Sequence, residues 1–372
     1  MNADRERWID SWKGMLILLV VLGHAVGMMA CSAQGTAYGV LVYLYRFIYF
    51  FHMPAFFMLV GVTSGLSEGA GANAEGKDDL TFAFVSRKFK RLMIPYFFWG
   101  VVSIVIFLTT MSLTSGVRGY GGQNWGSSFN FPWWRPFVSL LHGGFWPNGE
   151  GFRYNYVLWF LPCMFLVLLF RKAIQGFKPK SNNLKSNNLT ISSLLLLCLT
   201  LGGALRIYVG CLPWCLDRVP RFLAFVLLGE LIARCRWSVG GIGRISGSLV
   251  GWAIFAAGVV VFPDFRATYV SWIWYFAEAG MAALGCILSM SVARMVDCRF
   301  LASLGVASLG IMLTHKFPTV ALQAAVAKCG GVAIDSVALG LLASLGVTAV
   351  ATALAWGVAR VMPRGVGGTS RK

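Results

Sequence analysis

Long apolar stretches are the feature that most constrains how this chain can fold. A helix needs ~20 largely apolar residues to cross the hydrocarbon core of a bilayer. Because unpaired backbone groups are not tolerated in lipid, such stretches are expected to be helical. The 372-residue sequence therefore predicts an all-α, polytopic integral membrane bundle of about ten transmembrane helices. The ten stretches run roughly from Met15 to Cys31, Val40 to Leu66, Leu92 to Ser115, Tyr156 to Phe170, Thr190 to Cys211, Phe222 to Ala233, Leu249 to Pro263, Ser271 to Val292, Leu301 to Val326 and Val337 to Ala359.

Composition supports the membrane class and excludes others. The chain is 57% hydrophobic and only 12% charged, which does not fit a soluble protein. Its net charge of +18 does not indicate nucleic-acid binding, because the basic residues lie in short gaps between apolar stretches. The four histidines and nine cysteines form no cluster with zinc-site spacing, so no metal is expected. Cys211 and Cys215 are expected to be unpaired, although an oxidising compartment would favour a disulfide between them.

The distribution of basic residues predicts the orientation in the membrane. With the amino terminus in the cytoplasm, most of the 32 lysines and arginines fall on the cytoplasmic side, as the positive-inside rule requires. We therefore expect a multi-pass protein of the cell inner (plasma) membrane with both termini cytoplasmic. The transmembrane domain would occupy residues 1–362, followed by a basic cytoplasmic tail at 363–372. A cleaved signal ending near Cys31 is a competing interpretation, opposed by the acidic residues before the first stretch and by the histidine inside it.

The first stretch carries a lysine and a histidine on one helix face. Eleven steps of ~100° separate Lys13 from His24, so the two side chains share a stripe and differ in height by ~16 Å. Asp10 lies three residues before Lys13 and can pair with it or cap the helix. A histidine inside the membrane is by default a functional hypothesis. The alternatives are a snorkelling anchor for Lys13 and a structural hydrogen bond for His24.

Three further groups extend this hypothesis. His52, in the second stretch, comes near the depth of His24, so a two-histidine site between the first two helices is expected. Arg87, Lys88 and Arg91 share a helix face, as membrane anchors or as a seat for phosphate groups. His315 is placed in the outer half of the ninth stretch. Glu230 and Glu278 are isolated carboxylates within apolar stretches. Arg46, Arg206 and Arg221 lie toward the outer ends, and some of these five groups are expected to pair and neutralise each other.

These residues resemble the membrane-bound acyltransferase family 3, in the compact, stand-alone form similar to polysaccharide and fucose O-acetyltransferases. The most specific match is a basic residue, ten residues and a histidine, with Asp10 before them. The supporting matches are Phe51-His52-Met53-Pro54, the basic cluster leading to Pro95, the segment Leu158-Trp159-Phe160-Leu161, and His315. The resemblance covers nearly the whole chain.

The resemblance implies transfer of an acyl group, with acetyl expected, from cytoplasmic acyl-CoA to a hydroxyl of a carbohydrate or a lipid-linked glycan. Acetyl-CoA would be a co-substrate, and no permanently bound cofactor is expected. Imidazole, with an ordinary pKa of ~6.5, suits proton transfer near neutral pH, so His24 is the expected general base. His52 would orient the acceptor or stabilise the oxyanion, and Asp10 would position Lys13. The CoA phosphates would contact Lys13, Arg87, Lys88 and Arg91, and the acceptor would contact His315 and Trp159.

A transporter or exporter of a glycan or small molecule is the alternative from another class, with the histidines as a proton relay. It would be expected to show inverted repeats and broken helices, and the sequence indicates neither. Membrane lipids are the expected surroundings in both cases.

Overall fold

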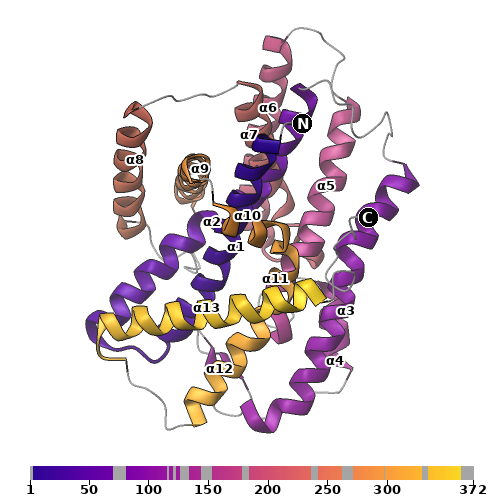
Figure 1. The fold of residues 1–372 in the computed structure, drawn as a ribbon. Helices are drawn as coiled ribbons and strands as arrows, with labels where there is room; N and C mark the ends of the chain where they lie inside the picture. The colour runs from indigo at the N-terminus through magenta and orange to yellow at the C-terminus, as the bar shows by residue number, and fades with distance from the viewer. Residues whose placement is uncertain are drawn as a thin grey trace.

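The computed structural model of the chain describes residues 3–69, 81–114, 117–119, 123–125, 134–143, 153–177, 184–235, 242–261, 271–296, 298–328 and 334–361. These residues form a helical bundle with one short antiparallel hairpin, made of β1 (Val117–Gly119) and β2 (Gln123–Trp125) (Figure 1). The predicted all-α membrane fold is confirmed. The basic tail and most of the segment between residues 115 and 152 lie outside the described residues.

Seven spans in the described part of the chain are long and apolar enough to cross a membrane. They lie in α1 (Ala3–Ala30), α2 (Gly35–Gly69), α3 (Phe82–Thr114), the η1 and α5 segments (Arg153–Trp159 and Phe160–Phe177), the α6 and η2 segments (Leu184–Ala204 and Leu205–Val209), α9 (Trp272–Met295) and α13 (Val337–Val361). Each coincides with one of the predicted apolar stretches.

The ninth predicted stretch is bent rather than continuous. It comprises α10 (Arg299–Val306), α11 (Ser308–Thr314) and α12 (Lys316–Lys328), with a bend of 64° between Val306 and Ser308. At the bend, Ala307 has φ −88° and ψ 2°, outside the helical region. If this bent pair is one span, the described residues contain eight spans.

The predicted number of ten exceeds this because two helices are short. α7 (Val219–Arg234) has 16 residues, and the apolar part of α8 (Ile242–Val261) covers only Gly247–Val261. α7 is nevertheless central, since most of its residues are buried. Its backbone touches α2, because a side chain at Gly61 would collide with the carbonyl of Val226, and one at Gly229 with the carbonyl of Met58. Small residues permit such close helix packing in membranes.

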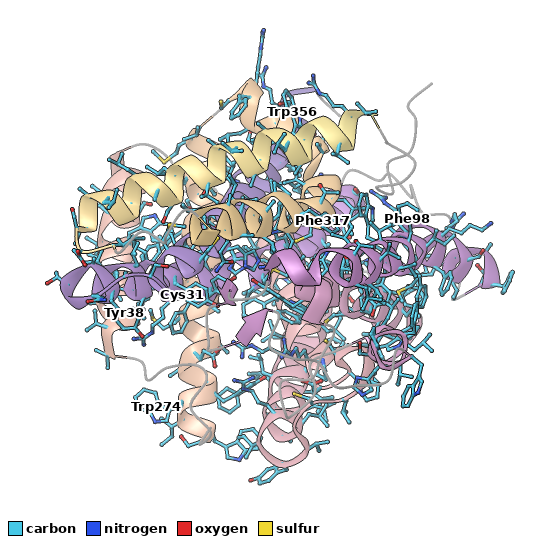
Figure 2. The ribbon with its side chains drawn as sticks, turned by 90° about the horizontal axis from the view of Figure 1, so that it is seen from below. Cys31, Tyr38, Phe98, Trp274, Phe317 and Trp356 are labelled. Atoms are coloured by element: carbon cyan, nitrogen blue, oxygen red, sulfur yellow. The ribbon has the colours of Figure 1, made fainter. Side chains whose placement is uncertain are left out.

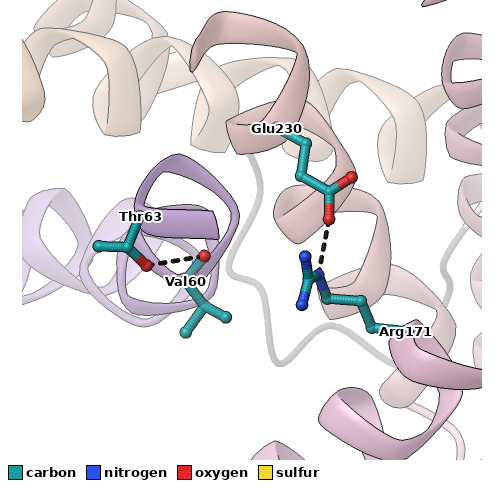
Figure 3. A network of polar contacts seen from close by, with 4 residues as sticks. All are labelled: Val60, Thr63, Arg171 and Glu230. Carbon is teal, nitrogen blue, oxygen red and sulfur yellow. Dashed lines mark hydrogen bonds and ion pairs between the residues drawn. The ribbon is translucent and has the colours of Figure 1, made fainter. Parts of the chain in front are cut away.

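Two ion pairs, one of them buried, also join the core helices. Figure 3 shows Arg171 at the end of α5 bonded to Glu230 of α7, with Nε and Oε1 2.6 Å apart. Arg221 and Glu278 form a second pair at 2.9 Å between α7 and α9. The pair of Arg221 with Glu278 is one of those expected, whereas Glu230 pairs with Arg171, which was not among the expected partners. In the same view Thr63 donates to the Val60 carbonyl within α2 at 2.9 Å.

The arrangement of helix ends gives the bundle two distinct sides. In Figure 1 the start of α1, the end of α5 and the starts of α6 and α8 lie toward the top, where many of the basic residues occur. α12 and α13 lie toward the opposite side, and Figure 2, seen from that side, places Trp356 of α13 and Trp274 of α9 at opposite edges. Exposed leucines such as Leu196, Leu342 and Leu345 suit a lipid-facing surface.

Candidate active site

His24 lies at the centre of a buried polar cluster. It is on α1, six residues before Ala30, the last residue of that helix. Its Nδ1 atom is 2.8 Å from the hydroxyl of Tyr49 and 2.9 Å from the hydroxyl of Tyr156. Both hydrogen bonds of His24 to described residues use Nδ1, so Nε2 is left for a ligand.

Helix α2 supplies two members of this cluster. Tyr49 and His52 lie three residues apart on one face of α2, and their ring centroids are 4.7 Å apart. Tyr49 therefore contacts both His24 and His52 and links the two histidines in one site. His52 is buried, and its Nδ1 lies 2.8 Å from the carbonyl oxygen of Ile48. Pro54 stays inside the continuous helix α2.

His315 was placed by the sequence in the outer half of the ninth stretch, and in the structure it lies in contact with His24. Its ring stacks on that of His24, with centroids 5.3 Å apart and planes 24° apart. The bend after α10 and the junction between α11 and α12 bring it there. Its Nδ1 is 2.8 Å from the carbonyl oxygen of Ile311. The structure thus joins His24, His52 and His315 in one cluster.

Hydrogen bonding settles the tautomers of two of these histidines. A carbonyl oxygen can only accept, so the Nδ1 atoms of His52 and His315 must carry the proton that each donates. In the neutral ring Nε2 is then a bare acceptor. His24 differs, because a tyrosine hydroxyl can donate to Nδ1 or accept from it.

A lysine and a broken helix complete the cluster. Lys316, buried at the start of α12, donates to the hydroxyl of Tyr156 at 3.2 Å and lies 4.4 Å from the centre of its ring. Tyr156 belongs to η1, where Asn155 has non-helical angles of φ −152° and ψ 78°. The Asn155 side chain donates from Nδ2 to the carbonyl of Leu313 at 3.3 Å. This break turns the start of the α5 span toward α11.

Sequence reasoning missed Tyr49, Asn155, Tyr156 and Lys316. Tyr49 could have been found, because it precedes His52 by three residues and must share its helix face. Lys316 follows His315 directly. Asn155 and Tyr156 gave no comparable signal, because their placement depends on the break in η1.

The predicted inner site is less closely assembled. Lys13 and Asp10 form an ion pair at 2.8 Å, as expected, and both side chains are partly exposed. Arg87, Lys88 and Arg91 lie near the start of α3, with Lys88 5.2 Å from the centre of the Phe84 ring. α3 packs mainly on α5 and η1, whereas α1 packs mainly on α10, α2 and α13. The two basic groups are therefore held by different neighbours.

Trp159 occupies a separate position on η1. Its ring stacks on Phe222 with a centroid distance of 5.7 Å, and the Arg218 guanidinium lies 5.1 Å from its ring centre. Both of these contacts are with residues at the start of α7.

The family of the chain follows from its match to a family model. The model for an acyltransferase domain, family 3, matches residues 6–360. The chain belongs to acyltransferase family 3. Comparison with curated proteins and with solved structures gives no significant match. The bent ninth span is a feature that transporters also show, but the family favours a membrane acyltransferase over the transporter alternative.

Proposed function

We propose that this membrane acyltransferase is an O-acyltransferase that moves an acetyl group from cytoplasmic acetyl-CoA to a hydroxyl of a carbohydrate or lipid-linked glycan. Polysaccharide modification at the plasma membrane would be its role. The proposal is supported by the arrangement around His24, whose Nδ1 is held by two tyrosine hydroxyls while Nε2 stays available. A ring nitrogen oriented by a partner on its other nitrogen is the arrangement expected of a general base.

The reaction requires one proton transfer in each direction. The acceptor hydroxyl oxygen attacks the thioester carbon, and Nε2 of His24 takes the hydroxyl proton. The carbon–sulfur bond then breaks, and the CoA thiolate leaves with the proton that the imidazolium returns. In the base-competent tautomer, Nδ1–H donates to the oxygen of Tyr49 or Tyr156 and the lone pair resides on Nε2.

The donor would approach from the end of the bundle that carries the basic residues. Lys13, Arg87, Lys88 and Arg91 are the proposed contacts for the CoA phosphates, since guanidinium and ammonium groups bind phosphate oxygens. Asp10 fixes Lys13 by their ion pair. The helical rise of ~16 Å from Lys13 to His24 then separates the phosphates from the thioester. His52 and Trp159 are proposed to orient the acceptor.

Purified protein in lipid nanodiscs, given radiolabelled acetyl-CoA and a crude glycan acceptor fraction, tests this proposal. Loss of a general base typically costs ~10²–10⁴-fold in rate, so we expect His24→Ala to lose label transfer and CoA release together. His142→Ala is the matched control, because His142 ends α4 (Arg135–His142) and forms no part of the histidine cluster. Equal transfer by wild type and His24→Ala would contradict the general-base role. With the protein reconstituted in sealed vesicles instead of nanodiscs, glycan uptake without CoA release would favour a transporter.

A further inference from the structure

Two buried side chains beside His24 have polar atoms without a partner. Asn155 and His315 are both 0% exposed. Among the described residues, Oδ1 of Asn155 and Nε2 of His315 make no hydrogen bond. Buried polar atoms are rarely left unsatisfied in native proteins, so each such atom calls for a ligand, a water molecule or another explanation.

Both atoms are hydrogen-bond acceptors, and the backbone fixes this assignment. The carbonyl of Leu313 must receive a donor, so the amide of Asn155 presents Nδ2 to it and turns Oδ1 away. The carbonyl of Ile311 likewise requires the proton of His315 on Nδ1, which leaves a lone pair on Nε2. The same short helix, α11, therefore orients both acceptors.

His315 contacts the proposed general base directly, and Asn155 is linked to it through its neighbour in sequence, Tyr156. The His315 ring stacks on His24 at 5.3 Å between centroids. Tyr156, the neighbour of Asn155 in sequence, bonds to Nδ1 of His24 at 2.9 Å. Asn155 is also bonded to Leu313, two residues before His315, so both open acceptors belong to segments that pack around His24.

The chemistry of the site selects a particular kind of ligand. Bare acceptors bind O–H donors and are repelled by the oxygens of carboxylates and phosphates. The Lys316 ammonium, 3.2 Å from the hydroxyl of Tyr156, disfavours a cationic ligand such as a protonated amine. A neutral ligand with neighbouring hydroxyls fits both conditions.

We propose that Asn155 and His315 form a subsite for a second hydroxyl of the acceptor, next to the hydroxyl that is acylated. This inference rests on the proposed function. The acceptor is therefore a neutral diol, and a single alcohol binds poorly. Asn155 and His315 are binding residues in this scheme, while the proton passes through His24.

A binding measurement tests the subsite without requiring turnover. The chain contains only four histidines, so ¹⁵N-histidine-labelled protein in nanodiscs gives a spectrum that single substitutions can assign. The probes are trans-1,2-cyclohexanediol and cyclohexanol, which share a ring and differ by one hydroxyl. We expect the diol to shift the Nε2 resonance of His315 at ~10-fold lower concentration than cyclohexanol, because a site built to bind a hydroxyl rejects an analogue that lacks it.

Substitution separates binding from a structural role. Asn155→Leu should bring the diol titration close to that of cyclohexanol, whereas Thr348→Val, which removes a buried but satisfied hydroxyl on α13, should preserve the preference. Equal shifts by both probes in wild type, or an Nε2 resonance already hydrogen-bonded to water that the diol leaves unchanged, would overturn the subsite. The acetyl-transfer assay of His24→Ala tests the proposed function separately. If that variant kept its transfer activity, the general-base role would fail while the binding result for the subsite would stand.

Discussion

The histidine cluster and the basic end of the bundle, which we propose to be the inner end, carry the two halves of the proposed chemistry, and they are built differently. At the cluster, side chains from α1, α2, η1 and the α11–α12 junction contact one another directly, with Nδ1 of His24 bonded to Tyr49 and Tyr156. At the inner end, Lys13 contacts Asp10, while Arg87 and Arg91 lie exposed on another helix.

The difference follows from burial. Most polar groups removed from water find a partner within the protein, because leaving them unpaired is costly. The histidine cluster is therefore assembled before any substrate arrives. Exposed cations are hydrated and need no partner in the protein, so a phosphate-bearing ligand can be what brings them together. Changes at the cluster should lower turnover, and changes at the inner end should weaken donor binding.

The largest expected effect on this comparison comes from Tyr156→Phe. The change removes a hydroxyl that bonds both His24 and Lys316, so each of these buried groups loses one hydrogen bond. We expect the kcat for acetyl transfer to fall ~10–100-fold, about 1.4–2.7 kcal/mol, with the KM for acetyl-CoA unchanged. Tyr43→Phe, which removes a hydroxyl bonded to the Ala256 carbonyl, is the control. A raised KM with unchanged kcat would reverse the assignment of the two regions.

Gly305→Ala tests the packing that joins the two regions. A Cβ at Gly305 would collide with the carbonyl of Asp10, so α1 and α10 must separate. Overpacking of this kind costs ~1–3 kcal/mol, and thermal unfolding in detergent should show a lowered Tm. Gly357→Ala is the control, since a Cβ there meets nothing within 4 Å. An unchanged Tm for Gly305→Ala would show that this contact is dispensable.

Arg91→Gln should act on donor binding alone. An exposed charged contact is worth up to about 1 kcal/mol, so we expect the KM for acetyl-CoA to rise ~5-fold while kcat stays constant. The effect should shrink in high salt. Arg360→Gln removes a cation near the end of α13, 3.8 Å from the centre of the Trp356 ring, and should leave the KM unchanged. A fall in kcat for Arg91→Gln would place this arginine in the chemical step.

Lys13→Arg should have the smallest effect. Arginine keeps the positive charge and can still pair with Asp10, so we expect less than a ~2-fold change in the KM for acetyl-CoA. Lys13→Gln, measured in parallel, should raise that KM several-fold because it removes the charge. A defect in Lys13→Arg as large as that of Lys13→Gln would show that the shape of the ammonium group matters.

The sequence predicted features that depend on local pattern. Hydropathy located the helices, and helical periodicity placed Lys13 and Asp10 within reach of each other. The stack of His315 on His24 could not be predicted, because it depends on the bend at Ala307 and on packing between distant segments. The same holds for Tyr156, whose position depends on the non-helical backbone of Asn155. The number of ten spans stays a prediction, because α7, although apolar and central, has only 16 residues.

The backbone contacts of α1 with α10 have a consequence for donor choice. Gly14 lies against the carbonyl of Leu301, and Gly305 against that of Asp10. The backbones of α1 and α10 are therefore in close contact on both sides of Lys13. In the proposed reaction the distance along α1 from Lys13 to His24 is then fixed, and it sets the separation between the phosphates and the thioester of the donor. A donor with its thioester too close to its phosphates, or with no phosphates, could not contact Lys13 and place its thioester at His24 at the same time. An acetyl thioester of N-acetylcysteamine should therefore be a much poorer donor than acetyl-CoA.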